Sequence, residues 1–248
     1  MASATTAPRT QRRPLAPLPV LVPPRRLPGV RPAMQRRSQA LVERLLEAAL
    51  ALLEDRDFDG LTIDDLCHAA GATVGSFYAR FDTKDAFITA LQHLVYERTA
   101  RSLERALADG RVPLDDLEGF AAWVCDGTVT WFQRYRGFIR ASSRLSGSEP
   151  KAWEPLRALG VLKTQWCLPL FRQLAGARAG KSFEASVRAG LQVLHGTLNN
   201  ITVVDPGPLR LDDPATKRFL TTVVLGCVRQ GLAPSPPTGR AAGRRRRR

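Results

Sequence analysis

Residues 73–80 carry side chains of the kinds that contact nucleic acid. The hydroxyls of Thr73 and Ser76 can hydrogen-bond to phosphates or base edges, and the guanidinium of Arg80 can read guanine through two parallel hydrogen bonds. Gly75 has no side chain, so the backbone there can approach a groove closely. These residue types indicate binding to DNA, provided that the local structure presents them on one face.

Two short helices are expected to present them. Thr62 is the predicted N-cap of the first helix and Thr73 that of the second, because a threonine hydroxyl accepts a hydrogen bond from the free N–H groups of a first turn. Phe77 and Phe81 are four residues apart, so both point inward from the second helix. The tight turn at residues 70–72 and these helix lengths are typical of a helix-turn-helix, whose second helix enters the major groove.

The stretch from about residue 39 to residue 94 resembles the helix-turn-helix region of the TetR/AcrR family of bacterial repressors. The residues that carry the resemblance are Leu61-Thr62-Ile63-Asp64-Asp65-Leu66, then Ala69-Ala70-Gly71-Ala72-Thr73-Val74-Gly75-Ser76-Phe77-Tyr78-Ala79-Arg80-Phe81, then Thr83-Lys84-Asp85. Two positions are less typical of the family. Cys67 replaces a small Ala, and Val74 is apolar where a polar residue often stands, which would suit contact with a thymine methyl group.

The resemblance implies two sets of DNA contacts. Contacts to phosphates are expected from Thr62, Tyr78 and Lys84. Contacts to bases or to the groove are expected from Thr73, Val74, Gly75, Ser76 and Arg80. Arg36 and Arg37 complete the predicted site, because they stand beside the first helix and could reach the duplex backbone.

The net charge of +14 is concentrated at the two ends of the chain. Residues 1–34 contain six Arg and no acidic residue, and residues 234–248 contain another six Arg and none. Both ends are predicted to be disordered, because they lack the apolar periodicity needed to bury a core. They are either solvated arms or arms that attract phosphates. Residues 35–92, by contrast, hold six basic and ten acidic residues, so the acidic side chains must lie mainly away from a bound duplex.

Apolar residues recur at steps of three and four along most of the remaining chain, which predicts an all-α fold of about nine helices. Pro169 is expected to kink or split its helix, and the strand-like run at residues 201–204 is interpreted as the end of a helix. The predicted division is a disordered Pro/Arg-rich arm (1–34), a TetR-type helix-turn-helix domain with a linker helix (35–105), a helical ligand-binding and dimerisation domain (106–232) and a disordered Arg-rich tail (233–248).

All four tryptophans and five further aromatic residues lie between residues 120 and 171. They indicate either ordinary core or an aromatic-lined pocket for a hydrophobic or planar ligand, which the family resemblance also implies. The candidate pocket residues are Phe120, Trp123, Trp131, Phe138 and Trp166.

The last two long helices, near residues 183–201 and 214–232, combine apolar stripes with small residues. The resemblance implies that they form a four-helix bundle with a second copy, although packing within one chain would use the same faces. The predicted interface residues are Val187, Leu191, Leu194, Leu198, Phe219, Val223 and Cys227. A two-fold dimer would place two reading helices on a palindromic DNA site.

Two other classes of function stay open as alternatives. Residues 175–182 fit a relaxed Walker A pattern, as in a nucleotide-binding P-loop enzyme, but residues 168–174 before them have helical spacing where a P-loop needs a strand. The segment is therefore interpreted as a turn between helices. The second alternative is a non-specific polyanion-binding protein that acts through its arginine-rich ends.

The widely spaced cysteines and the few histidines match neither a disulfide scaffold nor a zinc site, and no run of apolar residues is long enough to cross a membrane. No catalytic residues, metal or cofactor are expected, and the protein is expected to be cytoplasmic. The sequence thus predicts a sequence-specific, homodimeric transcriptional regulator. Its expected action is that of a repressor, released from a palindromic double-stranded DNA operator by a small hydrophobic inducer.

Overall fold

The computed structural model describes residues 27–33, 35–56, 60–148 and 153–233. Within these ranges the chain forms helices and two isolated β-bridges, without strands. The helices are α1 (Arg36–Asp55), α2 (Ile63–Ala69), α3 (Val74–Tyr78), α4 (Lys84–Ala108), α5 (Leu117–Arg134), α6 (Arg136–Ser148), α7 (Glu154–Ala175), the short 3-10 helix η3 (Gly176–Arg178), α8 (Phe183–Val203) and α9 (Pro214–Gln230). The predicted all-α fold is confirmed for the described part of the chain.

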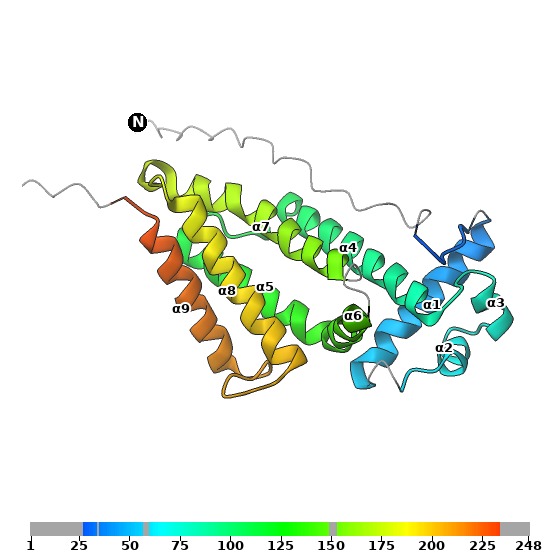
Figure 1. The fold of residues 1–248 in the computed structure, drawn as a ribbon. Coiled ribbons are helices and arrows are strands. Elements are labelled where there is room, and N and C mark those ends of the chain that lie inside the picture. Colours follow the sequence, from blue (N-terminus) through cyan, green and yellow to red (C-terminus); the bar gives the residue numbers. More distant parts are fainter. Residues whose placement is uncertain (1–26, 34, 57–59, 149–152, 234–248) are drawn as a thin grey trace, which may run out of the picture.

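The helices divide into two groups along the molecule (Figure 1). α1, α2 and α3 gather at one end, and the antiparallel pair α8 and α9 lies at the other. α4 leaves the first group and runs beside α7, against which it packs. The predicted domain boundary at residue 105 falls in the last turn of α4, so this one helix reaches from the helix-turn-helix into the rest of the fold.

Both predicted N-caps of the helix-turn-helix are confirmed. Thr62 Oγ1 accepts a hydrogen bond from the N–H of Asp65 at 3.0 Å. Thr73 Oγ1 accepts from the N–H of Ser76 at 3.2 Å, and Ser76 Oγ accepts in return from the N–H of Thr73 at 3.0 Å. This reciprocal capping box fixes where α3 begins, although α3 is only five residues long.

Three phenylalanines hold α3 against the start of α4. The rings of Phe77, Phe81 and Phe87 lie 5.0–5.4 Å apart between centroids, and all three side chains are fully buried. Phe77 and Phe81 point inward together, as their spacing predicts. A helix as short as α3 is marginal in isolation, so this aromatic cluster supplies the stability that its length cannot.

Residues 27–33 form an anchor segment that is hydrogen-bonded through its backbone to the end of the helix-turn-helix. Val30 and Phe81 form an antiparallel bridge, in which the N–H of Arg31 donates to the carbonyl of Arg80 at 2.8 Å and the N–H of Asp82 donates to the carbonyl of Gly29 at 2.8 Å. The structure here differs from the disordered arm expected over residues 1–34. The remainder of that arm, residues 1–26 and Met34, lies outside the described residues, as does the tail at 234–248.

The carboxyl-terminal half contains the proline and the strand-like run that the sequence analysis singled out. α7 runs through Pro169 as one helix, so the proline does not split it. Leu168, Leu170 and Phe171 are buried around Pro169, and this packing offsets the hydrogen bond that proline cannot donate. The run at residues 201–204 closes α8, which ends at Val203, and its interpretation as a helix end is confirmed.

No helix in the described part of the chain is both long and apolar enough to span a membrane. The four cysteines are unpaired, with Cys67, Cys125 and Cys167 buried and Cys227 partly exposed. The described residues contain no cluster of side chains suited to hold a metal ion.

Candidate DNA-binding surface and internal cavity

α3 presents its first turn and one side to solvent. Val74 and Tyr78 are 37% and 45% exposed, and Thr73 and Gly75 are exposed beside them. The opposite side of α3 is the buried Phe77. The short helix therefore has one face fixed in the core and one face free to enter a groove.

Ser76 and Arg80, predicted to read bases, are already engaged within the chain. The hydroxyl of Ser76 donates to the carbonyl of Thr73 at 2.6 Å while it closes the capping box. Nη1 of Arg80 donates to the carbonyl of Pro32 in the anchor segment at 3.2 Å, and the side chain is half-buried. In this arrangement Val74 and Tyr78 are the more accessible side chains of the reading helix.

The other predicted DNA-contacting residues lie at the starts of helices. Thr62 caps α2 and is exposed, and Lys84 is the first residue of α4 and is half-buried. Arg36 and Arg37 open α1 and are both exposed. The side-chain amide of Gln39 in α1 donates to the carbonyl of Ala33 at 3.1 Å, so the start of α1 is tied to the same anchor segment as Arg80.

Part of the acidic charge of this region is neutralised by ion pairs. Asp82 pairs with Arg31 of the anchor segment at 2.7 Å, and Asp65 pairs with Arg56 at 3.1 Å. Hydrogen bonding to Thr62, with the nearby Arg56 guanidinium, lowers the pKa of the Asp65 carboxyl. The anchor segment thus pairs a cation with Asp82, an acidic residue four positions after the end of α3.

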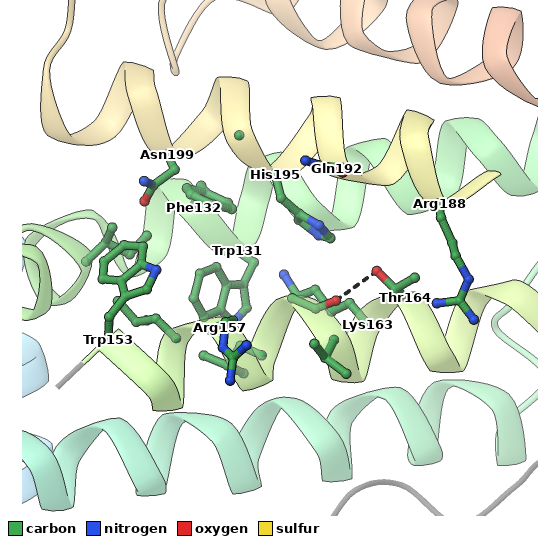
Figure 2. Close-up of a pocket in the computed structure, with 16 residues that line it drawn as sticks. Trp131, Phe132, Trp153, Arg157, Lys163, Thr164, Arg188, Gln192, His195 and Asn199 are labelled. Carbon is green, nitrogen blue, oxygen red and sulfur yellow. Dashed lines mark hydrogen bonds between the residues drawn. The ribbon is translucent and has the colours of Figure 1, made fainter. Parts of the chain in front are cut away.

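The second functional feature is a cavity of about 600 Å³ between α5, α7 and α8 (Figure 2). Aromatic side chains line one part of it, and Lys163 and His195 point into it from α7 and α8. The lining residues are Trp131, Phe132, Ile139, Trp153, Leu156, Arg157, Leu159, Gly160, Val161, Lys163, Thr164, Arg188, Gln192, His195, Gly196 and Asn199.

A smaller cavity of about 290 Å³ adjoins the first on the α4 side. Trp131, Lys163 and His195 line both cavities, so they form the wall between the two. Nε1 of Trp131 donates to Oγ1 of Thr99 in α4 at 3.0 Å, and the Thr99 hydroxyl donates to the carbonyl of Val95 at 2.8 Å. The cavity wall is therefore hydrogen-bonded to the helix that begins at the helix-turn-helix.

Three of the five predicted pocket residues line these cavities. Trp131 lines both, and Trp123 and Trp166 line the smaller one. Phe120 and Phe138 are instead fully buried in the core and line neither cavity.

Lys163 and His195 are the polar residues that sequence reasoning missed. Lys163 is 9% exposed, and its Nζ lies 4.2 Å from the centroid of the Trp131 ring. Burial lowers the pKa of Lys163 to about 7, and burial with the nearby lysine charge lowers the pKa of His195 to about 3. A signal for both was present, because Lys163 lies between Leu159 and Trp166, and His195 between Leu191 and Leu198, at the spacing of a buried helix face.

The predicted interface residues fall into two groups. Val187, Leu191, Leu194 and Leu198 are at most 1% exposed within the single chain, so they form its core rather than an outer surface. Phe219 is 51% exposed, and Val223 and Cys227 are partly exposed on α9. Cys227 faces Gly190 of α8 at the close contact between these two helices.

The Walker A-like residues 175–182 comprise the end of α7, the helix η3 and the turn into α8. The segment follows a helix, not a strand, and its interpretation as a turn between helices is confirmed.

Comparison with known proteins agrees with this geometry. A family profile described as bacterial regulatory proteins, tetR family, matches residues 45–91, which run from the middle of α1 into the first third of α4. YwcC of Bacillus subtilis, an uncharacterized HTH-type transcriptional regulator, is 37% identical over 84 residues. An uncharacterized HTH-type transcriptional regulator of Mycobacterium tuberculosis is 30% identical over 82 residues.

These two matches cover 34% and 33% of this chain, and only 34% and 41% of the relatives' own lengths. The fold extends the likeness further. A TetR transcription regulator from Haloarcula marismortui superposes with a TM-score of 0.62 at 13% identity, over 79% of this chain and 100% of that one. The helix-turn-helix region of the chain thus matches the tetR family of bacterial regulatory proteins, and the fold of the chain resembles that of a solved TetR transcription regulator.

Proposed function

We propose that the protein is a sequence-specific transcriptional regulator that binds a palindromic operator as a homodimer and releases it when a small molecule enters the cavity. The observation that carries the proposal is α3, a short helix with Val74 and Tyr78 exposed on one face and Phe77 buried on the other. An exposed apolar side chain at the start of a capped helix suits a thymine methyl group, and an exposed tyrosine at the end of that helix suits a backbone phosphate.

The proposed dimer uses the outer face of α8 and α9. Phe219 and Val193 are 51% and 44% exposed on these two helices, and Gly226 is exposed on α9. Exposed apolar side chains beside small residues suit the close approach of helices from a second copy. A two-fold axis through this surface would carry two α3 helices to one face of the duplex. As a regulator of transcription, the protein would act in the cytoplasm.

The proposed route from cavity to DNA passes through Trp131 and Thr99. A ligand that moves Trp131 acts on the hydrogen bond to Thr99, and hence on α4, whose first residue is Lys84. α4 also packs on α7, which carries Lys163. A ligand that binds more tightly when α4 is displaced than when α4 is placed for DNA contact would lower the affinity for DNA.

Selection of bound duplexes from a random pool tests the proposed function. The expected result is an enriched palindrome, because two copies of α3 read two equal half-sites. A pool that shows no enrichment would contradict the proposal and would favour the non-specific polyanion binder. A reporter gene placed behind the enriched sequence then distinguishes a repressor from an activator.

A further inference from the structure

We propose that the cavity takes an amphipathic carboxylate, with an aromatic or similarly apolar body against Trp131 and the carboxylate paired with Lys163. The inference rests on the proposed function only in naming this molecule as the effector. Binding itself is a property of the cavity and can be measured without DNA.

The first support is the position of Lys163. It projects from α7 into the wall between the two cavities and is more than nine-tenths buried, with its Nζ 4.2 Å from the Trp131 centroid and 5.9 Å from that of Phe132 (Figure 2). No carboxylate of the described residues forms an ion pair with it. A buried ammonium group without a counter-ion is costly, and a ligand carboxylate removes that cost.

The second support is the sign of the charge around Lys163. None of the described residues that line either cavity is acidic, whereas Arg157 and Arg188 stand at the larger one. Both arginines are exposed, and neither has a hydrogen bond or ion pair within the described part of the chain. The field in the cavity therefore favours an anion and disfavours a cation.

The third support is His195. Its Nε2 is buried and has no hydrogen-bond partner, and its ring points from α8 toward Lys163 in Figure 2. Burial keeps the imidazole neutral, because its pKa is lowered to about 3. A neutral imidazole protonated at Nε2 can donate to the second oxygen of a carboxylate that is paired with Lys163. One ligand group thus satisfies two polar groups that the chain leaves unsatisfied.

The apolar lining defines the rest of the ligand. Trp131, Phe132 and Trp153 offer aromatic faces, and Leu156 and Leu159 close the α7 side. Such walls bury a flat hydrocarbon body and offer it few hydrogen bonds, so binding energy comes from apolar contact and the single anionic group.

The experiment uses three probes that share one body: 2-naphthoate, its neutral amide 2-naphthamide, and the cation 2-naphthylmethylammonium. Each is titrated calorimetrically into the full-length protein without DNA. We expect 2-naphthoate to bind about 10- to 100-fold more tightly than the amide, the range of a charge-assisted hydrogen bond. The cation should bind most weakly.

Two variants identify the group responsible. Lys163→Met keeps the length of the side chain and removes its charge, so it should abolish the preference for 2-naphthoate over 2-naphthamide. Lys181→Met, an exposed lysine in the turn before α8, should leave that preference unchanged. Because the methionine is apolar in a buried site, Lys163→Met should fold, and unchanged binding of 2-naphthamide verifies that the cavity is intact.

Proton uptake gives an independent readout. In the free protein the pKa of Lys163 is about 7, so the amine is mostly neutral at about pH 8. Pairing with a carboxylate raises that pKa, so binding should take up about half a proton or more, measured in buffers of different ionisation enthalpy. Cys125 on α5 and Cys167 on α7 do not contribute, because burial raises their pKa values to about 11 and 12.

Three results would overturn the inference: equal affinity for 2-naphthoate and 2-naphthamide, no measurable binding of 2-naphthoate, or proton uptake that persists in Lys163→Met. The last result would assign the proton to His195. Failure of the regulator proposal is separate, because it would appear as 2-naphthoate binding normally while no DNA sequence is selected.

Discussion

Gly137 in α6 lies directly against the backbone of Leu53 in α1, so closely that a Cβ on residue 137 would overlap the carbonyl oxygen of Leu53. α1 belongs to the helix-turn-helix end, and α6 packs on α8 at the other end, where Nε of Arg140 donates to the carbonyl of Thr202 at 2.9 Å. The absence of a side chain at residue 137 thus permits the contact between α1 and α6 through which the helix-turn-helix end packs on the rest of the molecule.

Substitution of this glycine should destabilise the fold. Gly137→Ala forces α6 away from α1, and we expect a loss of about 1–3 kcal/mol in the free energy of unfolding, the usual cost of overpacking. Urea denaturation measures it. Gly147→Ala, in the same helix with nothing near the added methyl group, should be neutral or slightly stabilising. Equal stabilities for the two variants would show that α6 and α1 adjust freely.

The anchor segment should contribute to specific DNA affinity beyond its charge. Deletion of residues 1–26 removes five arginines but keeps residues 27–33, so the salt dependence of binding should flatten, by about 0.9 in slope for each phosphate that is no longer neutralised. Deletion of residues 1–33 also frees Arg80 from Pro32 and Asp82 from Arg31. This longer deletion should lower affinity for the selected sequence by roughly a further tenfold.

A point substitution separates position from charge in the same segment. Gly29 has φ +70°, and a Cβ there would lie 2.9 Å from Cβ of Ala86, so Gly29→Ala should detach the anchor without changing net charge. Its affinity should fall by the same roughly tenfold that separates the two deletions, while its salt dependence stays that of the wild type. Indistinguishable affinities for the two deletions would mean that the segment has no role in reading DNA.

Phe219 and Leu194 should respond to substitution in opposite ways. Phe219→Glu places a charge on the exposed face of α9 and should convert the proposed dimer to folded monomers. Leu194→Ala opens a cavity in the core of one chain, which should cost about 2–5 kcal/mol of stability while the dimer persists. Sedimentation and thermal unfolding distinguish these effects. A dimer that survives Phe219→Glu would place the interface elsewhere.

The stability of the free protein should rise with pH because of Lys163. The pKa of Lys163 is about 7 in the folded protein and about 10.4 in the unfolded chain. Between these values the unfolded chain binds more protons than the folded protein, so a rise in pH disfavours the unfolded chain. From about pH 7 to about pH 8.5 the wild type should therefore gain stability relative to Lys163→Met. The comparison stops at about pH 8.5 because Cys125 and Cys167 oppose the trend above that pH. Their pKa values are raised in the folded protein, so the unfolded chain loses these protons first and becomes relatively more stable. Parallel pH profiles would contradict a buried, charge-bearing Lys163.

Local sequence signals were sufficient to predict the helix-turn-helix. Thr62 and Thr73 cap their helices as expected, since capping depends on residues within four positions of each other. The anchor segment was not predictable in the same way. Its proline-rich composition is typical of disorder, and its order comes from backbone pairing with Phe81, some fifty positions away along the chain.

Helical periodicity also left the partners of each face open. The stripe through Leu191 and Leu194 predicts burial correctly, but it does not distinguish the core of one chain from an interface between two. The same limit applies to the aromatic residues. Phe138 and Trp131 belong to one aromatic-rich stretch, and only the packing of α5, α6 and α7 decides that Trp131 faces a cavity and Phe138 the core.

The specificity ratio of the full-length protein tests the central claim most directly. Affinity is measured for the palindrome enriched by selection and for a scrambled duplex of equal length, at one fixed salt concentration. We expect a ratio of about 10³ or more for the wild type, a sharp fall of that ratio in Val74→Glu on α3, and no change in Ser182→Ala, an exposed residue in the turn before α8 whose side chain makes no capping hydrogen bond. A ratio near one, or a ratio that Val74→Glu leaves intact, would contradict the claim that α3 reads DNA.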